Sequence, residues 1–179
     1  MPKAKAQNLP AAPWQVAVAV DDVAETGQHF DLVADASVRS AVARIAGLRD
    51  LPRLQARFDV SRHGAGGLHV TGVVSATVGQ NCVVTLEPLT NEIEEAIDLV
   101  FVPQRIAAPE AGEPAPRDVK WGDPEPLIGG IVDLGALATE FLILGLDPYP
   151  RKPDAVFEPP QSQTAEPGPF AALAKLAKN

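Results

Sequence analysis

The chain has 179 residues, of which 46% are hydrophobic, and its formal net charge is -8. The length fits one domain, and the hydrophobic content excludes a wholly disordered protein. An acidic chain repels phosphate, so the composition also excludes nucleic-acid binding driven by net charge alone.

The charges are unevenly distributed along the chain. Residues 36–72 contain six arginines against two aspartates, whereas residues 87–147 contain thirteen acidic residues against three basic ones. The single cysteine, Cys82, excludes an internal disulfide. Two prolines, Pro10 and Pro13, interrupt the apolar residues near the start, and no apolar run approaches the roughly 18 residues of a membrane helix. We therefore expect a cytoplasmic protein.

The first third of the chain predicts two strands and a helix. Residues 14–20 (WQVAVAV) and 28–33 read as strands because apolar side chains alternate along them. Residues 36–48 read as a helix with Ser37 as its N-cap. Its apolar stripe comprises Val38, Ala41, Val42, Ile45 and Leu48, which places Arg39 and Arg44 in water.

The central part of the chain predicts a β-hairpin. Residues 53–62 alternate between apolar and polar side chains, residues 63–67 (HGAGG) form a flexible turn, and residues 68–78 return as the partner strand. We expect residues 79–81 to turn the chain and residues 82–86 to form another strand, which Pro88 ends. Residues 91–102 suit either a helix or a strand, and we favour a long strand with its acidic face in solvent.

The segment 131–153 predicts a core helix followed by a rigid arm. Asp133 caps the helix, and its apolar face holds Leu134, Leu137, Ala138, Phe141, Leu142 and Gly145. Further apolar residues, Ile143, Leu144 and Leu146, widen this face, so we expect the helix to be covered on most sides. Three prolines, Pro148, Pro150 and Pro153, then hold Tyr149, Arg151 and Lys152 on an extended arm.

Two segments lack sustained apolar periodicity. Residues 103–126 are rich in proline and acidic residues and predict a surface loop. Residues 158–179 predict a flexible tail, in which residues 170–176 form a short amphipathic segment. We expect a single domain over residues 1–157.

No group of residues predicts a catalytic or metal site. Cys82 lacks the base that a nucleophile needs, so we interpret it as a buried structural thiol. The turn between His63 and His69 does not open a helix and therefore fails as a phosphate loop. No pair of cysteines is available for zinc. The acidic residues of the strand at 91–102 read as a solvated face: Glu92, Glu94, Glu95 and Asp98.

The arginines offer a contact surface for RNA phosphates or an acidic partner, although a solvated face is the simpler interpretation. Strict alternation places Arg62 on the inner face of its strand, so the twist or the turn must release it if it is to contact RNA. Base stacking is not supported, because aromatic residues are scarce. The RNA-contact candidates are Arg39, Arg44, Arg53, Arg57, Arg62, Arg151 and Lys152.

Four segments resemble the YceD family of large ribosomal RNA subunit accumulation proteins. They are NCVVTLEPL (81–89), IDLVFVP (97–103), residues 123–157 with the DPYPRKP arm, and PFAALAKL (169–176). The first resembles the family's C-x-R-C-L-x-P segment, with Cys82 kept, Val84 at the arginine and Thr85 at the second cysteine. Some members carry another cysteine pair after the core helix, which suggests a metal in those branches. PYPRKPDAVF stands there in this chain, so we expect no zinc.

The resemblance implies a non-enzymatic factor for accumulation or processing of large-subunit (23S) ribosomal RNA, without a cofactor or small-molecule substrate. Its partner would be ribosomal RNA, the precursor large subunit or a ribosomal protein. A generic protein-interaction module is the alternative, and a small-molecule enzyme comes third. The fold class we expect is α+β, with a curled, largely antiparallel sheet or small open β-barrel packed with two helices.

Overall fold

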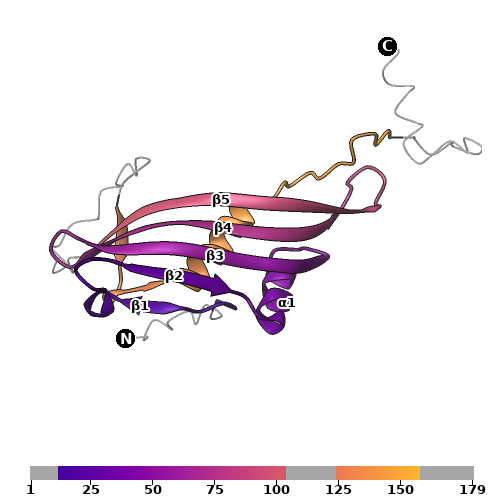
Figure 1. The fold of residues 1–179 in the computed structure, drawn as a ribbon. Coiled ribbons are helices and arrows are strands. Elements are labelled where there is room, and N and C mark those ends of the chain that lie inside the picture. Colours follow the sequence, from indigo (N-terminus) through magenta and orange to yellow (C-terminus); the bar gives the residue numbers. More distant parts are fainter. Residues whose placement is uncertain (1–11, 104–123, 158–179) are drawn as a thin grey trace, which may run out of the picture.

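A five-stranded sheet forms most of the computed structural model, which describes residues 12–103 and 124–157 (Figure 1). Strands β2 to β5 pair antiparallel in chain order, and β6 pairs parallel with β5 at the far edge. The sheet ends at β2 and β6 without closing, so the open sheet is correct and the barrel alternative is wrong. The strands are β2 (Gln28–Val33), β3 (Asp50–His63), β4 (Gly67–Asn81), β5 (Pro88–Pro103) and β6 (Glu125–Leu127).

The alternation expected for the central hairpin is confirmed. Along β3, Leu54, Phe58 and Val60 are buried, while Arg57 and Asp59 between them are exposed. The strand pairs with β4 across a turn at residues 64–66. The expected strand at 91–102 is also confirmed as part of the longer β5, and its acidic side chains at 92, 94 and 98 face solvent.

Two expectations around the β4–β5 connection are wrong. Residues 79–81 do not turn but continue β4, where Gly79 pairs with Asp50 of β3 on one side and with Thr90 of β5 on the other. Residues 82–86 are not a strand but the connecting turn. Pro88 consequently begins β5 instead of ending a strand, and the paired ladder runs out to Asn81 and Pro88.

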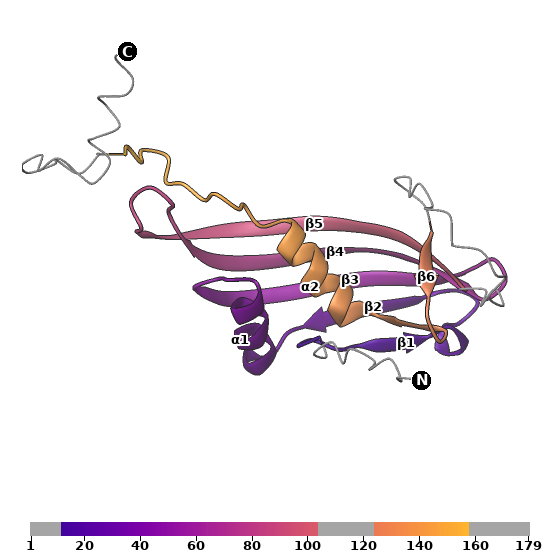
Figure 2. The ribbon, with the colours of Figure 1, turned by 180° about the vertical axis from the view of Figure 1, so that it is seen from behind.

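Helix α2 (Leu134–Leu144) crosses the inner face of the sheet, as Figure 2 shows from behind. Leu134, Ala138 and Leu142 are buried against it. Thr139, the one buried polar residue of the described chain, donates its hydroxyl to the Gly135 carbonyl at 2.9 Å. The remaining faces are less covered than expected, since Ile143 is 39% exposed and Leu144 is 71% exposed. The expectation of cover on most sides was therefore wrong at this end of the helix.

Asp133 joins three segments at the start of α2. Its Oδ1 atom accepts N–H groups from Gly135 at 3.0 Å and Ala136 at 3.1 Å, which confirms the predicted N-cap. The same oxygen accepts the Val16 N–H at 2.8 Å. This contact ties the N-terminal segment to α2, beside the small sheet of β1 (Ala17–Ala19) and β7 (Ile131–Asp133). The strand predicted over 14–20 is thus three residues long, and a 3-10 turn, η1 (Val20–Asp22), follows it.

Helix α1 (Ala36–Ile45) packs beside one end of β3. Its N-cap is Asp35 and not Ser37, because the Asp35 carboxylate accepts the Val38 N–H at 2.9 Å and the Ser37 hydroxyl at 2.7 Å. Val42 and Ala43 are buried, but Ile45 is 54% exposed and leaves the predicted stripe incomplete.

The expected loop over 103–126 lies mostly outside the described residues, as does the tail at 158–179. Of the loop's described part, Pro103 ends β5 and residues 125 and 126 belong to β6. Within the described ranges, no helix is long and apolar enough to cross a membrane.

Leu142→Ala should lower the free energy of unfolding by about 2–5 kcal/mol, because Leu142 is fully buried between α2 and the sheet. Leu144→Ala, on the exposed side of the same helix, is the matched control and should change stability by less than about 0.5 kcal/mol. Urea unfolding measures both variants. Equal effects would contradict the orientation of α2.

Candidate functional site

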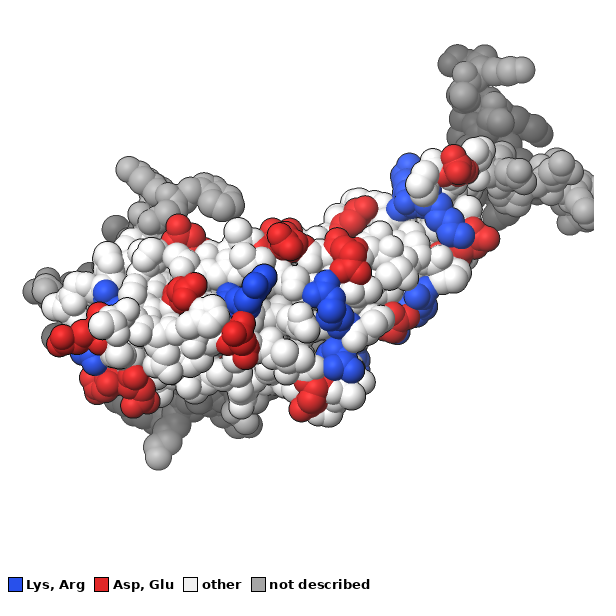
Figure 3. Space-filling view, in the orientation of Figure 1, with Lys and Arg blue, Asp and Glu red and all other residues white. Residues whose placement is uncertain are grey.

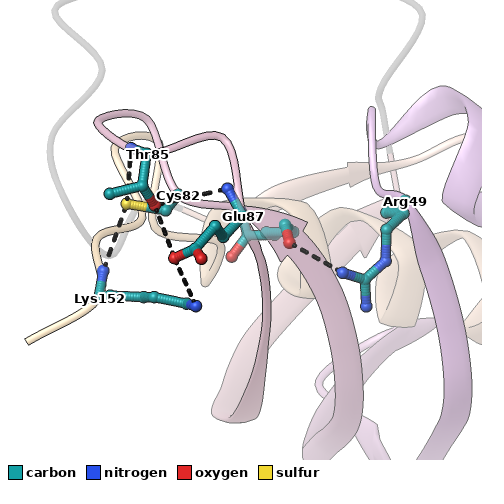
Figure 4. A network of polar contacts seen from close by, with 6 residues as sticks. Arg49, Cys82, Thr85, Glu87 and Lys152 are labelled. Carbon is teal, nitrogen blue, oxygen red and sulfur yellow. Dashed lines mark hydrogen bonds and ion pairs between the residues drawn. The ribbon is translucent and has the colours of Figure 1, made fainter. Parts of the chain in front are cut away.

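The turn at residues 82–87 and the proline arm at residues 147–153 are bonded to each other, and we call this unit the clasp (Figure 4). The Val83 N–H donates to the Pro150 carbonyl at 2.9 Å. The Lys152 N–H points at the Cys82 Sγ atom at 3.5 Å, as does the Thr85 N–H. The clasp thus joins segments that lie about seventy residues apart in the chain.

An ion pair and several hydrogen bonds close the clasp on its solvent side. Lys152 Nζ lies 2.7 Å from a Glu87 carboxylate oxygen, which the Thr85 hydroxyl also approaches at 3.2 Å. These contacts lower the pKa of Glu87, and the hydrogen bond from Lys152 is the largest cause. The Gln80 side chain donates to the Asp147 carbonyl at 3.0 Å and fixes the start of the arm to β4.

Cys82 lies at the centre of the clasp and has no solvent-exposed surface, which confirms its prediction as a buried thiol. Hydrogen bonds from the Thr85 side chain and N–H and from the Lys152 N–H lower the pKa of Cys82 to about 6, although burial acts in the opposite direction. The sulfur therefore acts as a hydrogen-bond acceptor between the turn and the arm.

The described residues hold no group of three or more His, Cys, Asp or Glu side chains arranged for a metal ion. Thr85, at the position of the resembled family's second cysteine, instead directs its N–H at Cys82. In the clasp, hydrogen bonds and the Lys152–Glu87 pair hold the turn and the arm together.

Three of the arginines line one open hollow between α1 and the start of β3. Arg39 donates to the Ala34 carbonyl at 2.7 Å, and Arg49 pairs with Asp50 at 2.7 Å. Arg44 is exposed and makes no hydrogen bond to a described residue. The hollow therefore offers one open guanidinium, Arg44, beside two that are already engaged.

The arginines of β3 point in different directions. Arg53 is bound on the outer face of the sheet, to Glu92 at 2.6 Å and to the hydroxyls of Ser75 and Thr77. Arg57 shares that face and has no bonded partner among the described residues. Arg62 keeps the inner position that alternation predicts: its guanidinium donates to the Val23 carbonyl at 2.7 Å and the Asp21 carbonyl at 3.3 Å. The strand twist does not release it toward Arg53 and Arg57.

The outer face of the sheet is mixed in charge and more acidic than basic (Figure 3). Arg53 and Arg57 share it with five carboxylates, and Figure 3 shows blue and red side chains interspersed along the molecule. No patch of a single sign forms on this face. The five carboxylates belong to Asp31, Asp59, Glu92, Glu94 and Asp98.

The acidic residues of β5 do not form a pair for acid–base chemistry. Glu92 binds Thr77 and Arg53, and these contacts lower the pKa of its carboxyl, with the Thr77 hydrogen bond as the largest cause. Asp98 binds His69 at 2.7 Å. Glu95 lies on the inner face, near Gly145 at the end of α2, so its assignment to the solvated face was wrong. Glu94 is exposed on the outer face, and Glu92 and Asp98 on the same face are each bonded to a different partner.

The structure places Arg151 and Lys152 in the clasp, where Lys152 is paired with Glu87 and Arg151 is exposed without a bonded partner among the described residues. Sequence reasoning recognised both halves of the clasp as distinctive but did not bring them together. The sequence does show proline-containing segments before β5 and after α2, but it does not show that these two segments lie close together in the folded protein.

A family model described as Large ribosomal RNA subunit accumulation protein YceD matches residues 70–177, which is more than half of the chain. The chain belongs to the YceD family. No curated protein and no solved structure matches it. The family's description names the accumulation of large-subunit ribosomal RNA, and it names no enzymatic reaction. The matched residues include both halves of the clasp and exclude α1 and β3.

The stability of the native protein should depend on the ionisation of Cys82. The folded-state pKa of about 6 lies below the value of about 8.5 expected for an unfolded chain. The thiolate contribution is therefore fully present above pH ~8.5 and is lost as the pH falls through about 6. Urea unfolding between pH 6 and about 8.5 should show a free energy of unfolding that rises with pH in the native chain and does not rise in Cys82→Ala. A pH-independent difference between the two proteins would contradict the acceptor role of the sulfur.

Proposed function

We propose that this protein is a non-enzymatic ribosome-biogenesis factor that acts in the cytoplasm and binds the precursor of the large ribosomal subunit. Its binding supports the accumulation or processing of 23S ribosomal RNA. The single observation that carries this proposal is the family match over residues 70–177. A binding role is supported by the structural contacts that engage the Cys82 thiol and the carboxylates of Glu87, Glu92 and Asp133.

In this proposal, RNA is contacted mainly by the arginines whose guanidinium groups are free to bind phosphate, which we call the open arginines. Arg44, Arg57 and Arg151 are exposed and have no bonded partner among the described residues. Arg39, Arg53, Arg62 and Lys152 remain candidates, but each would have to exchange an existing contact for a phosphate. Contacts of this type position a protein on RNA without reading its sequence, so we expect weak sequence preference.

The first experiment is deletion of the gene in the organism that encodes it. The ratio of 23S to 16S ribosomal RNA should fall in the deletion strain and recover when the native chain is restored. An unchanged ratio would remove the proposed function and leave a generic protein-interaction module as the better interpretation.

The second experiment tests the open arginines through the salt dependence of binding to precursor particles. Replacing Arg44, Arg57 and Arg151 with glutamine should reduce the slope of log affinity against log salt by about 0.7–0.9 for each phosphate contact that is lost. The matched control is Arg49→Gln with Asp50→Asn, which removes a bonded pair without changing the net charge, and Arg49 is not among the RNA-contact candidates. The control should retain the native slope. If the triple variant also retains it, these arginines form only a solvated surface.

A further inference from the structure

The clasp forms an exposed tip at one end of the molecule, where the β4–β5 hairpin and the arm meet (Figures 1 and 4). Three large apolar side chains are exposed on it: Val83 at 43%, Leu86 at 76% and Tyr149 at 71%. Pro148 and Pro150 line an adjacent hollow together with Val83. The tip therefore presents apolar surface that the protein's own core does not use.

Leu86 adopts a backbone conformation that leucine rarely takes. Its φ angle of 61° lies in the left-handed region, and it is the one described residue other than glycine with a positive φ. Two backbone hydrogen bonds hold it there: Leu86 N–H to the Cys82 carbonyl at 2.9 Å, and Cys82 N–H to the Glu87 carbonyl at 2.8 Å. Glycine would satisfy this turn without strain. A leucine that is strained and largely exposed to solvent indicates a use for its side chain.

Tyr149 is held as firmly as Leu86. It stands between two prolines, and its N–H donates to the Asp147 carboxylate at 2.8 Å. The neighbouring Pro150 carbonyl is fixed by Val83. Side chains on a backbone that is already ordered lose less conformational entropy when they bind a partner. The backbone of the tip is thus preorganised for docking.

The charges around the tip favour a protein over RNA as the partner. Lys152 is neutralised by Glu87, and Arg49 by Asp50. Asp147 adds a further negative charge, so Arg151 is the one open cation of the clasp. A surface without excess positive charge has little attraction for a polyanion. A tyrosine and an arginine beside exposed apolar side chains are instead typical anchors of protein interfaces.

We propose that the tip docks onto a folded protein of the large-subunit precursor particle, which is an inference that rests on the proposed function. Leu86 enters an apolar pocket on that protein, and Tyr149 packs at its edge. This contact is separate from the phosphate contacts of Arg44, Arg57 and Arg151. The family match supports a shared role for the tip, because it includes residues 82–87 and 147–153.

The test compares the native full-length chain with Leu86→Gly and Tyr149→Ser. Leu86→Gly relieves the positive φ, so the variant should melt at or above the native temperature. The matched control is Ile128→Asn, which removes an apolar side chain of similar exposure, 71%, from another turn. The probes are purified large-subunit precursor particles and the same particles after phenol extraction of all protein.

Both tip variants should bind the intact particles at least about tenfold more weakly than the native chain, whereas the control should bind normally. The difference in particle affinity between the native chain and the tip variants should persist when salt rises from about 0.1 to about 0.5 M, because salt does not screen apolar contacts. Binding to the extracted RNA should be the same for all four proteins.

Several results would overturn the docking proposal. The first is that both tip variants bind the particles with native affinity, and the second is that the native chain does not bind the particles at all. The third is that the tip variants lose as much affinity for the extracted RNA as for the particles. A native dimer that Leu86→Gly dissociates would assign the tip to a second copy instead. In the deletion strain, full rescue of the 23S RNA level by Leu86→Gly would contradict the docking proposal alone. An unchanged ratio of 23S to 16S RNA on deletion would contradict the proposed function as well.

Discussion

The packing of α2 across the inner face of the sheet is the constraint on which the rest of the structure depends. Leu134, Ala138 and Leu142 are fully buried there, and none of the described elements covers the outer face of β3, β4 and β5. The core on the inner face is completed by α1 and by the N-terminal segment with Trp14 and Val18. Different contacts fix the two ends of α2. At the start, Asp133 binds the first turn of α2 and Val16 with one oxygen atom.

At its other end, α2 brings the arm to the β4–β5 connection. Gly145 lies against the Glu95 side chain, which places the helix end over β5. From there the arm reaches Cys82 within seven residues. Because the β4–β5 ladder extends to Asn81 and Pro88, the connection that the arm meets lies beyond the region covered by α2. The clasp is therefore a consequence of where the helix ends and how long the hairpin is.

The sequence predicted those parts of the fold that depend on local periodicity. Alternation identified β3 and its partner, and the apolar run with Asp133 identified α2 and its cap. It failed where a distant residue decides the local structure. Gly79 looked like a turn residue, yet pairing with Asp50 of β3 and Thr90 of β5 makes it a strand residue. Apolar content at Ile143 and Leu144 predicted burial, but the chain supplies no described element to cover them.

The candidate site was less predictable than the fold, for the same physical reason. A list of arginines contains no information about which carboxylate or carbonyl each one meets, and Arg53 and Arg62 meet partners thirty-nine residues away. Hydrogen bonds to such partners occupy guanidinium donors that a phosphate would need. The resemblance marked the turn with Cys82 and the proline arm as distinctive, but only the three-dimensional fold joins them. The turn holds Leu86 in a conformation that leucine rarely adopts, through hydrogen bonds among Cys82, Leu86 and Glu87, and a strained residue persists only where the surrounding structure enforces it. The arm adds Tyr149 beside this turn, so the complete apolar tip exists only as long as both the hairpin and the end of α2 stay in place.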